Sequence, residues 1–168
     1  DEKTPIGYQF IWCHMVFDIK IEDFQRKAQF VASGHMTEPP ATLTYASIMS
    51  RETMCIALTI AALNDLQVKA GNIQNTYLTA SITKKVWTIL GPKFGDDQGT
   101  RAIIVHALYG LKSAGAAFRS HLAHAMHEMG YTSCLTDPDL WYKPQTRPDD
   151  HFDYYSYTLY YVDDILCI

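Results

Sequence analysis

The sequence predicts an α+β domain in which helices cover one face of an antiparallel sheet. Segments rich in Ile, Val, Phe and Tyr recur in both halves of the chain, and two longer segments between them have helical character. The 168 residues, 48% of them hydrophobic, suffice for one substantial core and not for two full-sized domains. We therefore expect one domain over residues 1–168.

The N-terminal part of the chain is expected to form a strand pair and then a helix. Residues 10–20 are rich in Ile, Val and Phe, and residues 26–32 follow after a short charged link. Ser50 is suited to cap a helix over about residues 51–65, and Glu52 in the first turn suits the helix dipole. Because this helix has few polar positions, we expect it to be largely buried.

Further strands and one more helix are predicted after residue 67. A helix should run from about residue 114 to residue 129, with hydrophobic side chains on one face and Gly130 placed to end it. The other predicted elements are strands at 68–74, 86–90, 101–108, 140–143, 154–162 and 165–168, loops at 91–92, 95–99 and 144–153, and a turn at 137–139. Strands thus outnumber helices in both halves of the chain.

Composition and cysteine spacing narrow the class of protein. The formal net charge of −4 gives no overall basic signature, which argues weakly against a dedicated nucleic-acid-binding protein. The four cysteines stand far apart and form no C-x-x-C pair, so neither a zinc ribbon nor a redox motif is indicated. No hydrophobic run is long enough to span a membrane. We expect a reduced, intracellular chain without a membrane partner.

The sharpest local feature is the sequence Tyr161-Val162-Asp163-Asp164, in which two carboxylates join two apolar strands. Two interpretations are open. The pair can be an ordinary exposed hairpin turn, since Asp is common in turns. Alternatively it can hold a divalent cation, which would offset the cost of placing two negative charges between buried strands. The dipeptide alone favours the turn, and its apolar flanks favour the cation site.

Five segments resemble, in the same order, motifs of the reverse transcriptases of copia-type LTR retrotransposons. The most characteristic is Ala107-Leu108-Tyr109-Gly110-Leu111-Lys112. The last is Tyr161-Val162-Asp163-Asp164, which has the form of the metal-site hairpin of these polymerases. The full set of matching segments is 26–32, 73–78, 107–112, 137–142 and 161–164.

This resemblance implies the fingers and partial palm of a right-hand polymerase, truncated at the C-terminal end of the palm. About residues 1–66 and 81–112 would be fingers-like, and about residues 67–80 and 113–168 would be palm-like. The resemblance also implies that the palm sheet brings position 72 beside Asp163 and Asp164.

The chemistry implied by the resemblance is nucleotidyl transfer. A primer 3'-hydroxyl attacks the α-phosphate of a deoxynucleoside triphosphate with the help of two Mg²⁺ ions. Family members hold these ions with three carboxylates, two of which match Asp163 and Asp164. The third position is Asn72 in this chain. An amide offers one neutral oxygen and a nitrogen that donates, so we expect impaired metal binding and catalysis.

Further site residues follow from the same resemblance. Lys27 would lie near the triphosphate and Lys112 near the template, although each can equally be a solvated surface lysine. Gln29 stands where copia-type strands carry Arg, which leaves Lys27 as the main cation on that strand face. Tyr77 would exclude a ribose 2'-hydroxyl, or else it is a core aromatic. The implied nucleotide-binding set is completed by Ile73, Tyr109 and Gly110.

The expected function is therefore that of an RNA-directed DNA polymerase domain fragment from the Pol polyprotein of a copia-type retrotransposon. Its partners would be an RNA or DNA template-primer and deoxynucleoside triphosphates, and it would be part of a longer Gag-Pol polyprotein. The alternative is a non-catalytic relic that binds single-stranded nucleic acid. If the parent element is active, the expected location is the cytoplasm, inside a virus-like particle.

Overall fold

The computed structural model describes residues 6–21, 24–36 and 49–168. The chain divides into two compact units, each built from two separate stretches. The first unit comprises Asp1–Thr44 and Tyr77–Phe118, and the second comprises Tyr45–Thr76 and Arg119–Ile168. Both units consist mainly of antiparallel strands with few helices, which confirms the expected mixture of structure.

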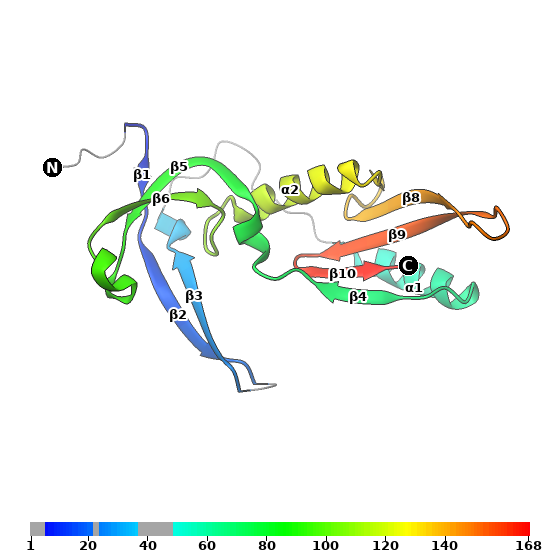
Figure 1. Cartoon of the computed structure of the whole chain (residues 1–168), viewed down its shortest axis with the longest axis horizontal. Helices are drawn as coiled ribbons and strands as arrows, with labels where there is room; N and C mark the ends of the chain where they lie inside the picture. Colours follow the sequence, from blue (N-terminus) through cyan, green and yellow to red (C-terminus); the bar gives the residue numbers. More distant parts are fainter. Residues whose placement is uncertain (1–5, 22–23, 37–48) are drawn as a thin grey trace. The chain divides into compact units, whose positions relative to one another are not determined.

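An antiparallel hairpin in the first unit consists of β2 (Cys13–Ile19) and β3 (Arg26–Ala32), which confirms the predicted strand pair (Figure 1). The end of β3 lies against the loop that contains Gly110, since the backbone N–H of Ala32 donates to the carbonyl of Tyr109 at 2.8 Å. Gly110 has a φ of +87°, and a Cβ built on it would lie 2.0 Å from the carbonyl oxygen of Ala32. Only glycine therefore fits this close approach of two backbones.

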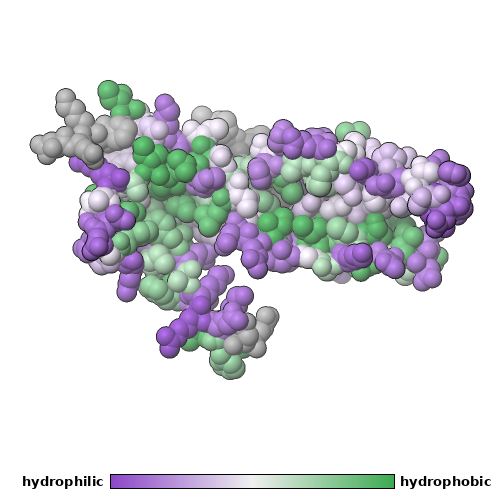
Figure 2. Space-filling model, in the orientation of Figure 1, coloured by the Kyte–Doolittle hydropathy of each residue, from purple (hydrophilic) through white to green (hydrophobic). Residues whose placement is uncertain are grey.

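The first unit also contains a three-stranded sheet, in the order β1-β5-β6. Its strands are β1 (Gln9–Phe10), β5 (Ser81–Ile89) and β6 (Arg101–His106). β1 runs parallel to β5, and β6 runs antiparallel to it. Val86 and Ile104 are buried on one face of this sheet. Figure 2 shows hydrophobic surface over the same three strands, so the sheet also exposes apolar side chains.

Short 3-10 helices connect several of the described strands. They are η1 (Gly34–Met36), η2 (Thr76–Thr79) and η3 (Pro92–Asp97). The last lies between β5 and β6, where the sequence predicted only loops. Pro92 at the first helical position favours a helix start there, because its φ is already close to the helical value.

A five-stranded antiparallel sheet forms the centre of the second unit. In order of pairing its strands are β4 (Lys69–Asn72), β10 (Asp164–Cys167), β9 (Asp153–Tyr161), β8 (Leu140–Thr146) and β7 (Thr132–Ser133). Figure 1 shows β4 beside β10, although they are far apart in the sequence. The predicted polar loop at 144–153 is shorter than expected, because residues 144–146 continue β8 and pair with β9.

The helices α1 (Arg51–Leu63) and α2 (Ala114–Glu128) pack on opposite faces of this sheet, so the prediction that helices cover one face is wrong. Successive side chains of a strand point to opposite faces. Trp141 of β8 belongs to the core cluster that includes side chains of α2, whereas its neighbour Leu140 lines a cavity with side chains of α1. Hydrophobic side chains on both faces of β8 and β9 allow each face to take a helix.

α1 begins where it was predicted to begin, but it is not buried. The hydroxyl of Ser50 accepts a hydrogen bond from the N–H of Thr53 at 3.0 Å, which confirms the predicted cap. Only Ala61 of α1 is buried, while Leu63 is 80% exposed, so the prediction of a largely buried helix is wrong. The described residues cover only the side of α1 that faces the sheet. α1 belongs to the second unit.

α2 ends at Glu128, and Gly130 terminates it as predicted. This glycine has a φ of +83°, and its N–H donates to the carbonyl of His127 at 2.9 Å. Further back on the helix, Met126 packs on the sheet and accepts a hydrogen bond from the hydroxyl of Tyr160 at 3.1 Å. Burial raises the pKa of Tyr160 to about 12, which keeps this hydroxyl a donor. No helix in the described part of the chain is long and apolar enough to cross a membrane.

Candidate active site

A tight hairpin joins β9 to β10 and contains both acids that the sequence singled out. Tyr161 pairs with Asp164, so the turn between the strands consists of Val162 and Asp163. Val162 has a φ of +58°, which is rare for a β-branched residue and stores backbone strain. The two acids therefore lie at the tip of a hairpin, Asp163 in the turn and Asp164 at the first position of β10.

The strand β4 brings Asn72 to this hairpin. Asn72 is the register partner of Asp164, and its Nδ2 donates to Oδ1 of Asp164 at 3.3 Å. The next backbone N–H, that of Ile73, donates to the carbonyl oxygen of Asp163 at 2.7 Å. The expected adjacency of position 72 and the acidic pair is thus present, although 92 positions separate Asn72 from Asp164.

The donor set at the hairpin does not fit a centre for two divalent ions. An ionised carboxylate only accepts hydrogen bonds, so the amide of Asn72 turns its nitrogen, and not its oxygen, toward Asp164. Two carboxylates remain, and within the described residues no group of three His, Cys, Asp or Glu side chains is arranged to hold a metal ion. A pair of Mg²⁺ ions carries more positive charge than these two carboxylates offset.

Asp164 also borders a mostly apolar cavity of about 160 Å³. Met49 and Met54 line this cavity from the side of α1, and Leu159 and Leu166 line it from the sheet. Asp164 itself is exposed, and so is its hydrogen bond with Asn72.

Lys27 and Gln29 lie in the first unit and share one face of β3, as predicted. Across the hairpin, Lys27 is the register partner of Asp18, and Gln29 is the register partner of Val16. Side chains directly opposite in an antiparallel pair are neighbours. Asp18 and Lys27, which have opposite formal charges, therefore lie on the same face of this hairpin.

The remaining predicted nucleotide-binding residues of the first unit lie around the loop between β6 and α2. Tyr77 packs edge-on against Tyr109, with ring centroids 4.8 Å apart, and also against Phe118 at 6.3 Å. These are the contacts of a core aromatic, one of the two interpretations of Tyr77. Gly110 makes the backbone contact with β3, and Lys112 is exposed. Asn72 and Ile73 belong, with the acidic hairpin, to the second unit.

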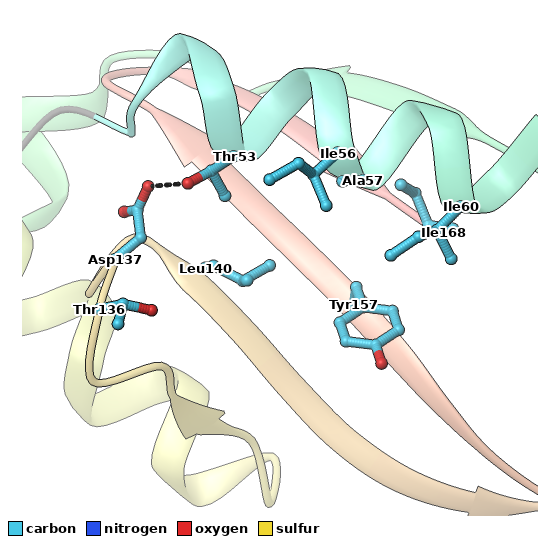
Figure 3. A pocket seen from close by; sticks show the side chains of 9 residues that line it. All are labelled: Thr53, Ile56, Ala57, Ile60, Thr136, Asp137, Leu140, Tyr157 and Ile168. Atoms are coloured by element: carbon cyan, nitrogen blue, oxygen red, sulfur yellow. Dashed lines mark hydrogen bonds between the residues drawn. The ribbon is translucent and has the colours of Figure 1, made fainter.

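Asp137 is a buried carboxylate that the sequence analysis placed in a turn and in the matching segment 137–142, without a role of its own. Its Oδ2 accepts hydrogen bonds from the backbone N–H of Ser50 at 3.0 Å and from the hydroxyl of Thr53 at 2.5 Å, the second of which is drawn in Figure 3. Its Oδ1 accepts from the N–H of Asp139 at 3.2 Å. Burial acts to raise the pKa of Asp137, but these hydrogen bonds outweigh burial and lower it below its usual value.

These hydrogen bonds make Asp137 the link between the sheet and the start of α1. Figure 3 shows the apolar cavity beside this link, about 260 Å³ in volume, between Ile56 and Ile60 of α1 and Leu140 and Tyr157 of the sheet. Both carboxylate oxygens of Asp137 accept hydrogen bonds from the chain itself, which supports a structural role for this residue. Ser50 was identifiable as a cap from the sequence, but nothing in the sequence indicated its contact with Asp137, which lies 87 positions further along the chain.

Comparisons with known proteins show that the chain is similar to retrotransposon polyproteins. The profile of a family described as reverse transcriptase (RNA-dependent DNA polymerase) matches residues 1–167. The Retrovirus-related Pol polyprotein from transposon RE2 of Arabidopsis thaliana is 24% identical over 170 residues, and that from transposon RE1 of the same plant is 26% identical over 170 residues. Each alignment covers 96% of this chain and 11% of the relative. No solved structure matches the chain.

Proposed function

Because the chain belongs to the reverse transcriptase family, we propose that it is a piece of the polymerase region of a retrotransposon Pol polyprotein, derived from an RNA-directed DNA polymerase. The chain spans about a tenth of the length of the curated relatives that it matches. The observation that carries the proposal is the pairing of β4 with β10. This pairing sets position 72 opposite Asp164, as a polymerase metal site of this family would need.

The second unit corresponds to the partial palm in this proposal, and the first unit to the fingers. The five-stranded sheet with the acidic hairpin supports the assignment of the palm, because a palm must hold its carboxylates on neighbouring strands. The assignment includes α1 in the palm, since α1 is anchored to that sheet through Asp137. The fingers then contain the hairpin of Lys27 and Gln29 and the loop of Tyr109, Gly110 and Lys112.

Asn72 disables catalysis in this proposal. Asp163 and Asp164 keep the negative charge of two of the three family positions, but the amide at position 72 donates a hydrogen bond to Asp164 and occupies one of its lone pairs. Magnesium ions, when held by a complete set of carboxylates, stabilise the attacking and leaving oxygens of phosphoryl transfer. With Asn72 in place we expect the hairpin to hold its shape without supporting that reaction.

The other family positions keep binding roles in the proposal. Lys27 attracts the triphosphate of an incoming deoxynucleotide. Asp18, opposite Lys27, weakens this attraction, and Gln29 beside Lys27 adds no positive charge. Tyr77, held by Tyr109, limits the space beside the sugar. The substrates are a template-primer and deoxynucleoside triphosphates. The location, if the parent polyprotein is produced by an active element, is a cytoplasmic virus-like particle.

The test is magnesium-dependent primer extension on an RNA template. The unchanged chain and Asn72→Asp are each assayed alone and after replacing the matching segment of the transposon RE1 polyprotein. We expect extension only for Asn72→Asp in the polyprotein, because that protein alone has three carboxylates and the neighbouring parts of a polymerase. The matched control is Asn72→Asp combined with Asp163→Asn, which restores position 72 but keeps the total charge unchanged and should remain inactive.

Two results would overturn parts of the proposal. Extension by the unchanged chain in the polyprotein would show that Asn72 does not disable catalysis. Equal extension with and without Asp163→Asn would show that the hairpin is not the catalytic site.

A further inference from the structure

The sheet of the second unit carries a row of tyrosine side chains that the proposed function does not use. Tyr142 of β8 is the register partner of Tyr157 of β9, and Pro144 is the register partner of Tyr155. Register partners in an antiparallel pair point to the same side, as do residues two positions apart in a strand. The four side chains therefore share one face of the sheet. Here this surface is called the tyrosine face, and its members are Tyr142, Pro144, Tyr155 and Tyr157.

The tyrosine face lies on the side of the sheet that faces α1. Tyr157 and Leu140, which precedes Tyr142 by two positions, line the apolar cavity between α1 and the sheet (Figure 3). Further along the strands the face is open, since Tyr155 is 52% exposed and Pro144 is also exposed. The part of β8 from Leu140 to Thr146 is roughly 20 Å long. The face is thus a strip that begins at an apolar cavity and continues onto open surface.

The tyrosine rings support one another along this strip. The ring centroids of Tyr142 and Tyr155 lie 5.9 Å apart, and those of Tyr155 and Tyr157 lie 6.4 Å apart. The planes of the two pairs of rings meet at 72° and 39°, so the rings do not form a flat layer. Each tyrosine offers an apolar ring for packing and a hydroxyl that can donate a hydrogen bond. The strip is therefore suited to a partner that is apolar and has exposed acceptors.

The charged side chains on this side of β8, β9 and β10 are acidic. They are Asp153, at the open end of the strip, and Asp164, at the acidic hairpin. Lys143 of β8 points to the opposite face, because it alternates with Tyr142. Arg147, which follows β8, is paired with Asp150 at 3.2 Å. The charges on this side of the sheet therefore favour a partner that has positive charge beside its apolar groups.

We propose that the tyrosine face binds a proline-rich peptide segment with basic residues at its ends, in the polyproline II conformation. This helix rises 3.1 Å per residue, so about seven residues span the strip of roughly 20 Å. Proline rings pack on aromatic surfaces, and a basic residue beyond the prolines would lie near Asp153.

Hydrogen bonding favours this peptide over a helical partner. A polyproline II segment has no internal hydrogen bonds, so its carbonyls can accept from the tyrosine hydroxyls. An α-helix uses its carbonyls within its own backbone and would leave these hydroxyls without acceptors from the partner backbone. The extended peptide therefore uses both the rings and the hydroxyls of the tyrosine face.

This proposal goes beyond the proposed polymerase function, because it needs neither Asn72 nor the turn of the acidic hairpin. Asp163→Asn should therefore bind the peptide as the unchanged chain does. A failure of peptide binding and a failure of primer extension are thus separate results.

The experiment measures the fluorescence anisotropy of a labelled peptide, about seven prolines with one arginine at each end, titrated with the full chain. Two comparison peptides have alanines in place of the prolines or glutamates in place of the arginines. Each should bind at least about 10-fold more weakly, because the first is not preorganised and the second has the wrong charge.

Variants of the chain test which face binds the peptide. Tyr155→Ala should weaken binding roughly 10-fold or more, since it removes a central ring. Tyr155→Phe keeps the ring and should weaken binding only about 5-fold, by the loss of one hydrogen bond. Asp153→Asn should make the affinity less dependent on salt. Circular dichroism melting of each variant checks that the fold is kept.

The matched control is Tyr154→Ala. Tyr154 is the neighbour of Tyr155 in β9 and is also exposed, but it points to the opposite face, so its loss should leave the affinity unchanged. Equal affinities of the Tyr154→Ala and Tyr155→Ala variants would overturn the proposal, as would equal binding of the arginine and glutamate peptides. Self-association of the chain that Tyr155→Ala abolishes and that the peptide does not displace would also overturn it, in favour of a second copy of the chain.

Discussion

The two units of the chain differ in charge, although the chain as a whole is only mildly acidic. The first unit contains nine Lys and Arg against eight Asp and Glu, and the second contains five against ten. Their formal net charges are therefore +1 and −5, which together give the overall −4. The net charge of the whole chain does not reveal this division. It is therefore only weak evidence against binding of nucleic acid.

The two units also differ in where their charged side chains lie. In the second unit carboxylates perform structural tasks as well as forming the acidic hairpin: Asp137 anchors α1, and Asp139 pairs with Arg119 at 3.3 Å. In the first unit cations lie along strands, as Lys85 of β5 and Arg101 of β6 do. The comparison teaches that the acidic unit uses its charges to hold elements together, whereas the first unit presents its cations on the surface of a sheet.

Gly110→Ala should have the largest effect and should act on the first unit. The added Cβ would overlap the carbonyl of Ala32, and the φ of +87° disfavours any side chain. We expect a loss of roughly 3 kcal/mol or more in the free energy of unfolding, measured by urea denaturation. Gly91→Ala is the control, because a Cβ there meets no atom within 4 Å, and it should change stability by less than about 0.5 kcal/mol. Similar losses in both variants would refute the requirement for close backbone approach.

Asp137→Ala should have the next largest effect and should act on the second unit. It leaves two backbone N–H groups and the hydroxyl of Thr53 without their acceptor, at a cost of roughly 2 to 3 kcal/mol in the free energy of unfolding. Hydrogen exchange should show the loss of protection at the start of α1. Asp150→Ala removes an exposed partner of Arg147 and should cost at most about 0.5 kcal/mol.

The same carboxylate should make the stability depend on pH. The pKa of Asp137 is lower in the folded chain than in the unfolded chain, so its contribution is complete above the unfolded pKa and is lost as the pH falls through the folded pKa. Asp137→Asn should therefore show a smaller loss of stability in acid than the unchanged chain. An unchanged acid dependence would mean that other carboxylates are responsible.

Asn72→Asp should have the smallest effect on stability. It would add one more negative charge to the second unit, which is already the acidic one. Without divalent ions, a third carboxylate facing Asp164 should lower the free energy of unfolding by about 1 kcal/mol. Mg²⁺ should reverse this loss, since an ion that binds only the folded state stabilises it. Thermal melting with and without Mg²⁺ measures both effects, with Asn72→Ala as a control that should not respond to the ion. An equal response of the unchanged chain would contradict the conclusion that its donor set does not fit two Mg²⁺ ions.

Much of the local structure was predictable from the sequence because it depends on neighbours along the chain. The cap at Ser50, the end of α2 at Gly130 and the hairpin at Asp163 are all decided within a few residues. The pairing of Asn72 with Asp164 was predicted only through the resemblance to a known family. No local pattern encodes a contact between strands that lie so far apart in the sequence.

The sequence by itself determined the family, the main strands and helices, and the chemistry available at the acidic hairpin. Only the tertiary structure decided that α1 and α2 lie on opposite faces of the sheet, that α1 is exposed, and that Asp137 is its anchor. The same holds for the sheet of β1, β5 and β6, in which β1 pairs with a strand about 70 residues further along the chain. The physical reason is that burial and pairing depend on which distant segments meet, whereas propensities, caps and turns depend on covalent neighbours.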